Sequence, residues 1–148
     1  MGFNYEEEVK QWKWEIPERY NIGYDCVDKH AEGKNKNKVA LYWENEQGKA
    51  EKYTFLEMKN LSNKFGNVLR NLGLKKGDRF LMRLPNIPQF QIVFIGGVKI
   101  GAVPIPSSTM FRGHEVEYRI NDSGAVAVVT TPEFVKEVEE IRDKCPTL

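Results

Sequence analysis

Apolar and polar positions follow two different periods between residues 39 and 73. Residues 39–44 and 49–54 alternate in character around the turn sequence Asn-Glu-Gln-Gly, which predicts a β-hairpin. Thr54 and Glu57 then form a capping box, and Gly73 occupies the position of a left-handed helix end. Between them, three-and-four spacing predicts a helix with one buried stripe, made of Met58, Leu61, Phe65, Val68, Leu69 and Leu72.

Short apolar strands alternate with helical patterns from residue 79 onward. The expected strands are 79–84, 102–105 and 125–130, and the expected helices are 87–100, 113–122 and one that begins at Pro132 after a Thr131 cap. Asn86 is a candidate N-cap, and Gly96 and Gly97 indicate close packing against another backbone. We therefore predict an α/β fold with a mostly parallel sheet, helical crossovers and an N-terminal β-hairpin.

The first 38 residues are less regular than the rest of the chain. Residues 22–31 fit a helix, because Val27 and Ala31 stand four positions apart. The segment before it is expected to drape over the domain and to use aromatic anchors such as Trp12, Trp14 and Tyr20. This pattern predicts an N-terminal extension, residues 1–38, that packs on a domain formed by residues 39–148.

Composition and charge restrict the class of protein. A chain of 148 residues with 41% apolar and 29% charged residues is typical of one globular domain, and a net charge of +1 gives no argument for nucleic acid. The longest apolar run, Ile92–Ile95, is too short for a membrane helix. The acidic N-terminus is not a signal peptide, and Cys26 and Cys145 fit reduced thiols. We therefore expect a cytoplasmic protein without a membrane partner.

Motifs for catalysis are scarce. Neither a dinucleotide-binding glycine pattern nor a phosphate-binding Gly-Lys loop is present, and the isolated His30 and His114 do not predict a metal site. One place has suitable geometry, because ligands of open parallel sheets bind beyond the carboxyl ends of the strands. There, the strand ending at Pro106 leads into residues 107–111, which could form a turn, contact a phosphate or touch a cofactor.

An ordered series of segments carries a family resemblance. These segments are YTFLEM (53–58), GVKIGAVPIPSSTMF (97–111), EVEYRINDSGAVAVVT (115–130) and VEEIRDKCPTL (138–148). Together they resemble the N-terminal part of the AMP-forming acyl-CoA synthetases, adenylate-forming enzymes, and most closely the medium-chain group. The resemblance implies an incomplete N-terminal subdomain of the acyl-CoA synthetase fold.

The resemblance also implies a function for the parent enzyme. That enzyme would use ATP and Mg²⁺ to activate a carboxylic acid as an acyl-adenylate, and would then transfer the acyl group to CoA. The family's phosphate loop with its Pro-Lys ending and its catalytic lysine have no match here, so we expect this chain alone to be inactive and assign it no catalytic residue. An alternative is a freestanding α/β module that binds a partner or a nucleotide.

The resemblance places one candidate site on this chain. Ser108, Thr109 and Met110 correspond to positions that approach bound CoA in relatives. Met110 departs from the family pattern, which often has glycine or glutamine at that position. An incomplete sheet further predicts a homodimer that forms through an exposed strand edge or apolar face.

Overall fold

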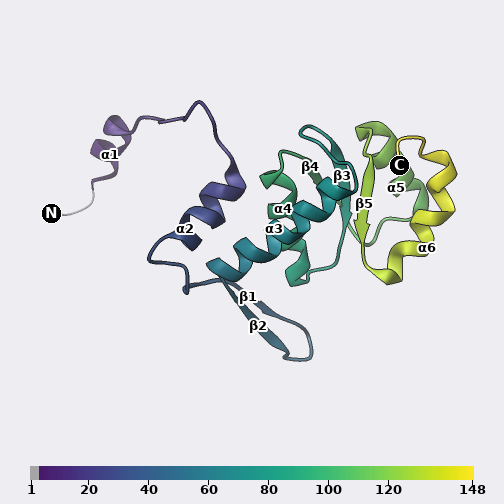
Figure 1. Cartoon of the computed structure of the whole chain (residues 1–148), viewed down its shortest axis with the longest axis horizontal. Helices are drawn as coiled ribbons and strands as arrows, with labels where there is room; N and C mark the ends of the chain where they lie inside the picture. Colours follow the sequence, from purple (N-terminus) through teal and green to yellow (C-terminus); the bar gives the residue numbers. More distant parts are fainter. Residues whose placement is uncertain (1–3) are drawn as a thin grey trace.

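A three-stranded parallel sheet lies at the centre of the protein. The structure, a computed structural model, describes residues 4–148. The sheet contains β3 (Arg79–Arg83), β4 (Val103–Pro106) and β5 (Ala127–Thr130), with β3 in the middle of the order β4-β3-β5 (Figure 1). Both pairings are parallel. The predicted α/β class and parallel sheet are therefore confirmed.

Helices cover the two faces of this sheet. α3 (Phe55–Asn71) precedes β3, α4 (Pro88–Lys99) connects β3 to β4, and α5 (Gly113–Ser123) connects β4 to β5. α6 (Pro132–Ile141) follows β5 and continues into a short 3₁₀ turn, η2 (Arg142–Lys144). Alternating β3 side chains divide the core, because Phe80 and Met82 pack with α3 and α4 whereas Leu81 packs with α5 and α6.

The helix α3 begins as predicted but buries a different stripe. Both reciprocal bonds of the Thr54–Glu57 capping box are present, and Gly73 has a left-handed φ of 96°. The buried positions are Met58, Ser62, Gly66 and Leu69. Val68 and Leu72, which were predicted to be buried, are instead exposed.

Small residues at the contact between α3 and α4 explain this difference. A Cβ atom on Gly96 would lie 2.7 Å from the backbone oxygen of Ser62, so the two helices approach too closely for larger side chains. A Cβ atom on Gly97 would lie 2.6 Å from the Phe80 ring. The close packing predicted for Gly96 and Gly97 is confirmed. The predicted Asn86 cap is wrong, since α4 has Ile87 as its N-cap and Pro88 in its first turn.

The N-terminal part contains the predicted hairpin and helix. The hairpin consists of β1 (Val39–Glu44) and β2 (Ala50–Thr54), which pair antiparallel. A π-helical turn, η1 (Tyr24–Asp28), continues into α2 (Lys29–Glu32), and this unit packs through Val27 and Ala31.

The segment before this unit differs from the expectation. It contains α1 (Tyr5–Gln11), which lies apart from the other elements in Figure 1. Trp12 and Trp14 are 66% and 80% exposed and contact each other edge to face, and Tyr20 is exposed as well. The predicted aromatic anchoring is therefore wrong, whereas the predicted domain boundary at residue 38 stays a prediction.

The two outer strands present different free edges. The Val103 amide donates to the Asp78 carbonyl just before β3, and the Ser107 amide donates to the Met82 carbonyl in β3. In a parallel ladder, the intervening Pro104 and Pro106 therefore face the open side. Proline has no N–H to offer, which blocks further pairing along β4. β5 has no proline, and its open side therefore retains backbone donors.

Candidate functional site

The three strands of the sheet end at one edge, and the loop of residues 107–112 lies there. β3, β4 and β5 end at Arg83, Pro106 and Thr130. Ser107 extends the β4 ladder by donating its amide to the Met82 carbonyl at 2.8 Å, and its side chain is buried. The loop therefore starts from a fixed point at the carboxyl end of the sheet, where open parallel sheets bind ligands.

The Arg83 side chain holds the next part of this loop. Arg83 is only 1% exposed, and its Nη2 donates to the carbonyl oxygens of Thr109 at 3.1 Å and Phe111 at 2.7 Å. The same nitrogen lies 2.5 Å from Oε2 of Glu137 in α6, and the guanidinium stacks over the Phe134 ring at 4.4 Å. One buried cation thus connects the central strand, the loop and α6.

Further contacts stabilise the remaining backbone of the loop. The Ser108 hydroxyl accepts a hydrogen bond from the Met110 amide at 3.1 Å. The Arg119 guanidinium of α5 lies 3.7 Å from the centre of the Phe111 ring. Beyond the loop, the Arg112 amide donates to Glu115 at the start of α5 at 2.8 Å. The main chain is therefore held at several points by neighbouring elements.

The predicted site residues lie together on the outer side of this loop. Met110 is 86% exposed, Ser108 is exposed and Thr109 is half-buried. The loop thus presents a thioether, hydroxyl groups and backbone atoms to a ligand. Among residues 4–148, no three His, Cys, Asp or Glu side chains gather as metal ligands. The outer surface of the loop therefore combines hydroxyl groups with one large exposed apolar side chain.

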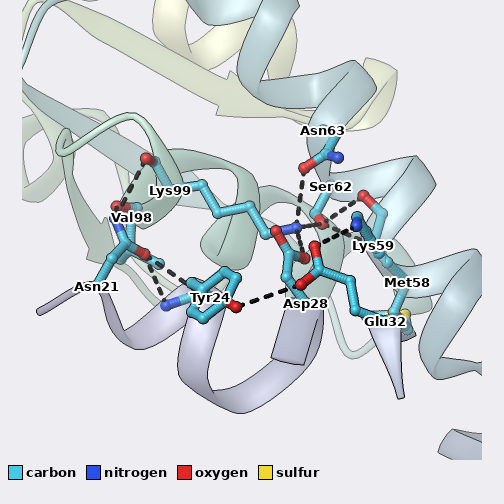
Figure 2. A network of polar contacts seen from close by, with 11 residues as sticks. Asn21, Tyr24, Asp28, Glu32, Met58, Lys59, Ser62, Asn63, Val98 and Lys99 are labelled. Carbon is cyan, nitrogen blue, oxygen red and sulfur yellow. Dashed lines mark hydrogen bonds and ion pairs between the residues drawn. The ribbon is translucent and has the colours of Figure 1, made fainter. Parts of the chain in front are cut away.

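A second polar cluster joins the N-terminal unit to α3 and α4 (Figure 2). Nζ of Lys99 lies 2.5 Å from Asp28 and donates to the Ser62 hydroxyl at 2.8 Å and to Asn63 at 2.9 Å. Burial lowers the pKa of Lys99, although the Asp28 carboxylate opposes that shift. Asn21 adds hydrogen bonds from its amide to the Val98 and Lys99 carbonyls. These contacts hold residues 21–32 against α3 and α4.

Sequence reasoning missed both of these buried cations. Each is a charged residue that follows a run of apolar residues: Arg83 follows Phe80, Leu81 and Met82 in β3, and Lys99 lies at the end of the mostly apolar helix α4. A charge in such a position needs a partner when the element is buried. That signal could have identified the two residues, but their partners lie 26 to 71 positions away in the sequence.

Comparisons with known proteins show that the chain is similar to part of the acyl-coenzyme A synthetases. It is 41% identical to the acetyl-coenzyme A synthetase of Bacillus subtilis over 98% of this chain and 27% of that protein. It is 34% identical to the mitochondrial acyl-coenzyme A synthetase ACSM1 of Mus musculus over 89% of this chain and 24% of that protein. The chain therefore spans about a quarter of the length of these relatives.

Solved structures give the same relationship. An acyl-CoA synthetase from Brucella canis matches 95% of this chain with a TM-score of 0.84 and 27% identity, and this chain covers 27% of that structure. The anthranilate CoA ligase AuaEII, in complex with anthranoyl-AMP, matches 90% of this chain with a TM-score of 0.79 and 28% identity, covering 24% of that structure. Residues 27–148 match the sequence model of the AMP-binding enzymes. The chain belongs to the AMP-binding enzyme family, which confirms the resemblance inferred from its motifs.

Proposed function

We propose that this chain is the N-terminal part of an AMP-forming acyl-CoA synthetase. The observation that carries this proposal is the 41% identity to an acetyl-coenzyme A synthetase over almost the whole chain. The parent enzyme would activate a carboxylic acid with ATP to an acyl-adenylate and would then form the CoA thioester. In that reaction, this part would supply three strands of the sheet and the loop of residues 107–112.

Within this proposal, the loop forms one wall of the CoA site through Ser108, Thr109 and Met110. The position of the loop beyond the carboxyl ends of the strands supports the assignment. Its hydroxyl groups suit polar groups of a nucleotide, and the exposed Met110 offers an apolar surface for stacking. The exposed Arg112 next to the loop adds a positive charge that complements the phosphates of CoA.

ATP and Mg²⁺ are assigned to other segments of the parent enzyme. Residues 4–148 contain no cluster of candidate metal ligands, and the sequence contains no glycine-rich loop ending in Lys-Ser or Lys-Thr. These residues do not fit an Mg²⁺ site, so we derive no catalytic step through the metal in this part. The chain on its own is expected not to catalyse exchange between ATP and pyrophosphate.

A segment exchange tests the proposal. This chain would replace the aligned segment of the Bacillus subtilis acetyl-coenzyme A synthetase, and acetate-dependent ATP–pyrophosphate exchange and thioester formation would be measured. We expect both activities in the exchanged enzyme and neither in the 148-residue chain alone. A folded exchanged enzyme without either activity would contradict the proposal. Micromolar binding of AMP or CoA by the chain alone, measured by calorimetry, would favour a freestanding nucleotide-binding module.

Association and location are also part of the proposal. None of the helices in the described residues is long and apolar enough to cross a membrane. The cytoplasmic location stays a prediction, since the relatives include mitochondrial enzymes. The open edge of β5 supports a twofold dimer, because its backbone donors and acceptors remain available for another strand.

A further inference from the structure

We infer that Arg83 is a positioning residue for the CoA-facing loop and thereby sets the affinity of the parent enzyme for CoA. This inference rests on the proposed function, since it concerns the same loop. Arg83 does not touch a ligand in this scheme, because its side chain is buried beneath the loop. It acts through the backbone of Thr109 and Phe111, the residues on either side of Met110.

The bonding of the guanidinium supports this role. All of its hydrogen bonds and its ion pair are made by Nη2, while Nε and Nη1 have no hydrogen-bond partner within residues 4–148. Hydrogen bonds from a charged donor are stronger than those from a neutral one, so the two bonds to the loop carbonyls are charge-assisted. Both hydrogen bonds of the Arg83 side chain are therefore made to the backbone of the loop and, within the described residues, none is made to the core.

Glu137 and Phe134 make this arrangement possible. The Glu137 carboxylate balances the buried charge, and the Phe134 ring covers one face of the guanidinium at 4.4 Å. Both residues belong to α6. Contacts with α6 therefore hold the Arg83 guanidinium in place, and the guanidinium in turn holds the loop through its hydrogen bonds. The two bonded carbonyls lie on either side of Met110, whose side chain is exposed to solvent.

Arg79 provides a matched control in the same strand. Its Nε and Nη2 donate to the carbonyl oxygens of Ser123 at 2.8 Å and Gly124 at 3.1 Å. Like Arg83, it therefore donates to two backbone carbonyl oxygens, but it lies at the amino end of β3, away from the loop of residues 107–112. A lysine at either position keeps the charge, but its Nζ lies one bond nearer to the backbone than the Nη2 atom of arginine and cannot take the same place.

The first measurement uses the 148-residue chain. Hydrogen exchange of the amides of residues 108–112 would be compared between the wild type, Arg83→Lys and Arg79→Lys. We expect exchange in the loop to be at least tenfold faster in Arg83→Lys and unchanged in Arg79→Lys. Unchanged exchange in a folded Arg83→Lys variant would overturn the inference. If that variant does not fold, Glu137→Gln is used instead, and we expect it to accelerate exchange in the same amides.

The second measurement uses the exchanged Bacillus subtilis enzyme. In Arg83→Lys we expect the KM for CoA to rise at least tenfold, while the KM for ATP and the rate of ATP–pyrophosphate exchange stay within twofold. A merely structural role would change all three values together, which would overturn the inference. A mobile loop with an unchanged KM for CoA would uphold the link between Arg83 and the loop but refute the CoA assignment. An exchanged enzyme that is inactive even with Arg83 intact would refute the proposed function alone.

Discussion

Replacing Gly96 by alanine should destabilise the protein, although the same change stabilises most helices. In an exposed helix, alanine is more favourable than glycine by about 1 kcal/mol. At Gly96, however, the added Cβ would lie 2.7 Å from the Ser62 carbonyl oxygen and 3.2 Å from the Gly66 nitrogen. Both are backbone atoms of α3 and cannot rotate away, so α3 and α4 would have to separate.

The size of the effect is the cost of the steric clash minus the gain in helix propensity. Relieving the clash means widening a contact from 2.7 Å to at least 3.4 Å along the interface between the two helices. Overpacking of a well-packed core costs about 1–3 kcal/mol, and the rigid backbone places this case near the upper value. After subtracting the gain in helix propensity, we expect a net loss of about 2 kcal/mol, which corresponds to a fall in Tm of about 4–8 °C.

Chemical denaturation followed by circular dichroism would measure this loss. Gly33→Ala is the control, because the nearest atom to its added Cβ would be the Lys29 carbonyl oxygen at 3.6 Å, an ordinary contact. We expect the control to change the free energy of unfolding by less than about 0.5 kcal/mol. A Gly96→Ala variant as stable as the wild type, or more stable, would refute the close approach of the two helices.

Three further predictions concern titration, thiol reactivity and association. The hydrogen bond to Glu51 raises the pKa of Tyr53 to about 12. The contribution of this hydrogen bond to the stability of the fold is therefore complete below pH 10 and is lost as the pH rises from 10 to 12. Tyr53→Phe should remove the latest phase of the absorbance titration at 295 nm, and an unchanged titration would contradict this. Ellman's reagent should modify the exposed Cys26 in the native protein but Cys145 only after unfolding, because burial shields that thiol and raises its pKa; two fast thiols would be inconsistent with the fold. The wild type should sediment as a dimer at micromolar concentration and Val129→Pro as a monomer, since the backbone N–H of Val129 points to the open side of β5 while its side chain packs in the core; a monomeric wild type would exclude pairing through this edge.

Local signals in the sequence were sufficient for most of the elements. The hairpin, the capping box of α3 and the alternation of strands and helices after residue 79 depend on residues close together in the chain. These signals gave the α/β class and the position of the loop at the carboxyl edge of the sheet. They gave no contacts between distant elements, which is why the bonds of Arg83 to the loop were not predicted.

The error in the buried stripe of α3 occurred where packing selected small side chains rather than apolar ones. Apolar spacing along α3 predicted that Val68 and Leu72 would be buried, but the close contact with α4 buries Ser62 and Gly66 instead. A hydroxyl group fits there because Ser62 donates to the Met58 carbonyl at 2.6 Å within its own helix. Burial of Ser62 therefore depends on the distance between two helices, which no pattern within one helix contains.

The loop of residues 107–112 combines a fixed backbone with exposed side chains, and this combination has a consequence for binding. Ordering a flexible loop on a ligand reduces affinity, because the entropy lost by each immobilised residue opposes binding. Here Arg83 and the ladder bond of Ser107 order the main chain in the absence of a ligand. Substitutions of Met110 should therefore alter the contacts with a ligand while leaving the loop in place. In the proposed function, the exposed side chains on this ordered backbone would determine the contacts that the loop makes with CoA.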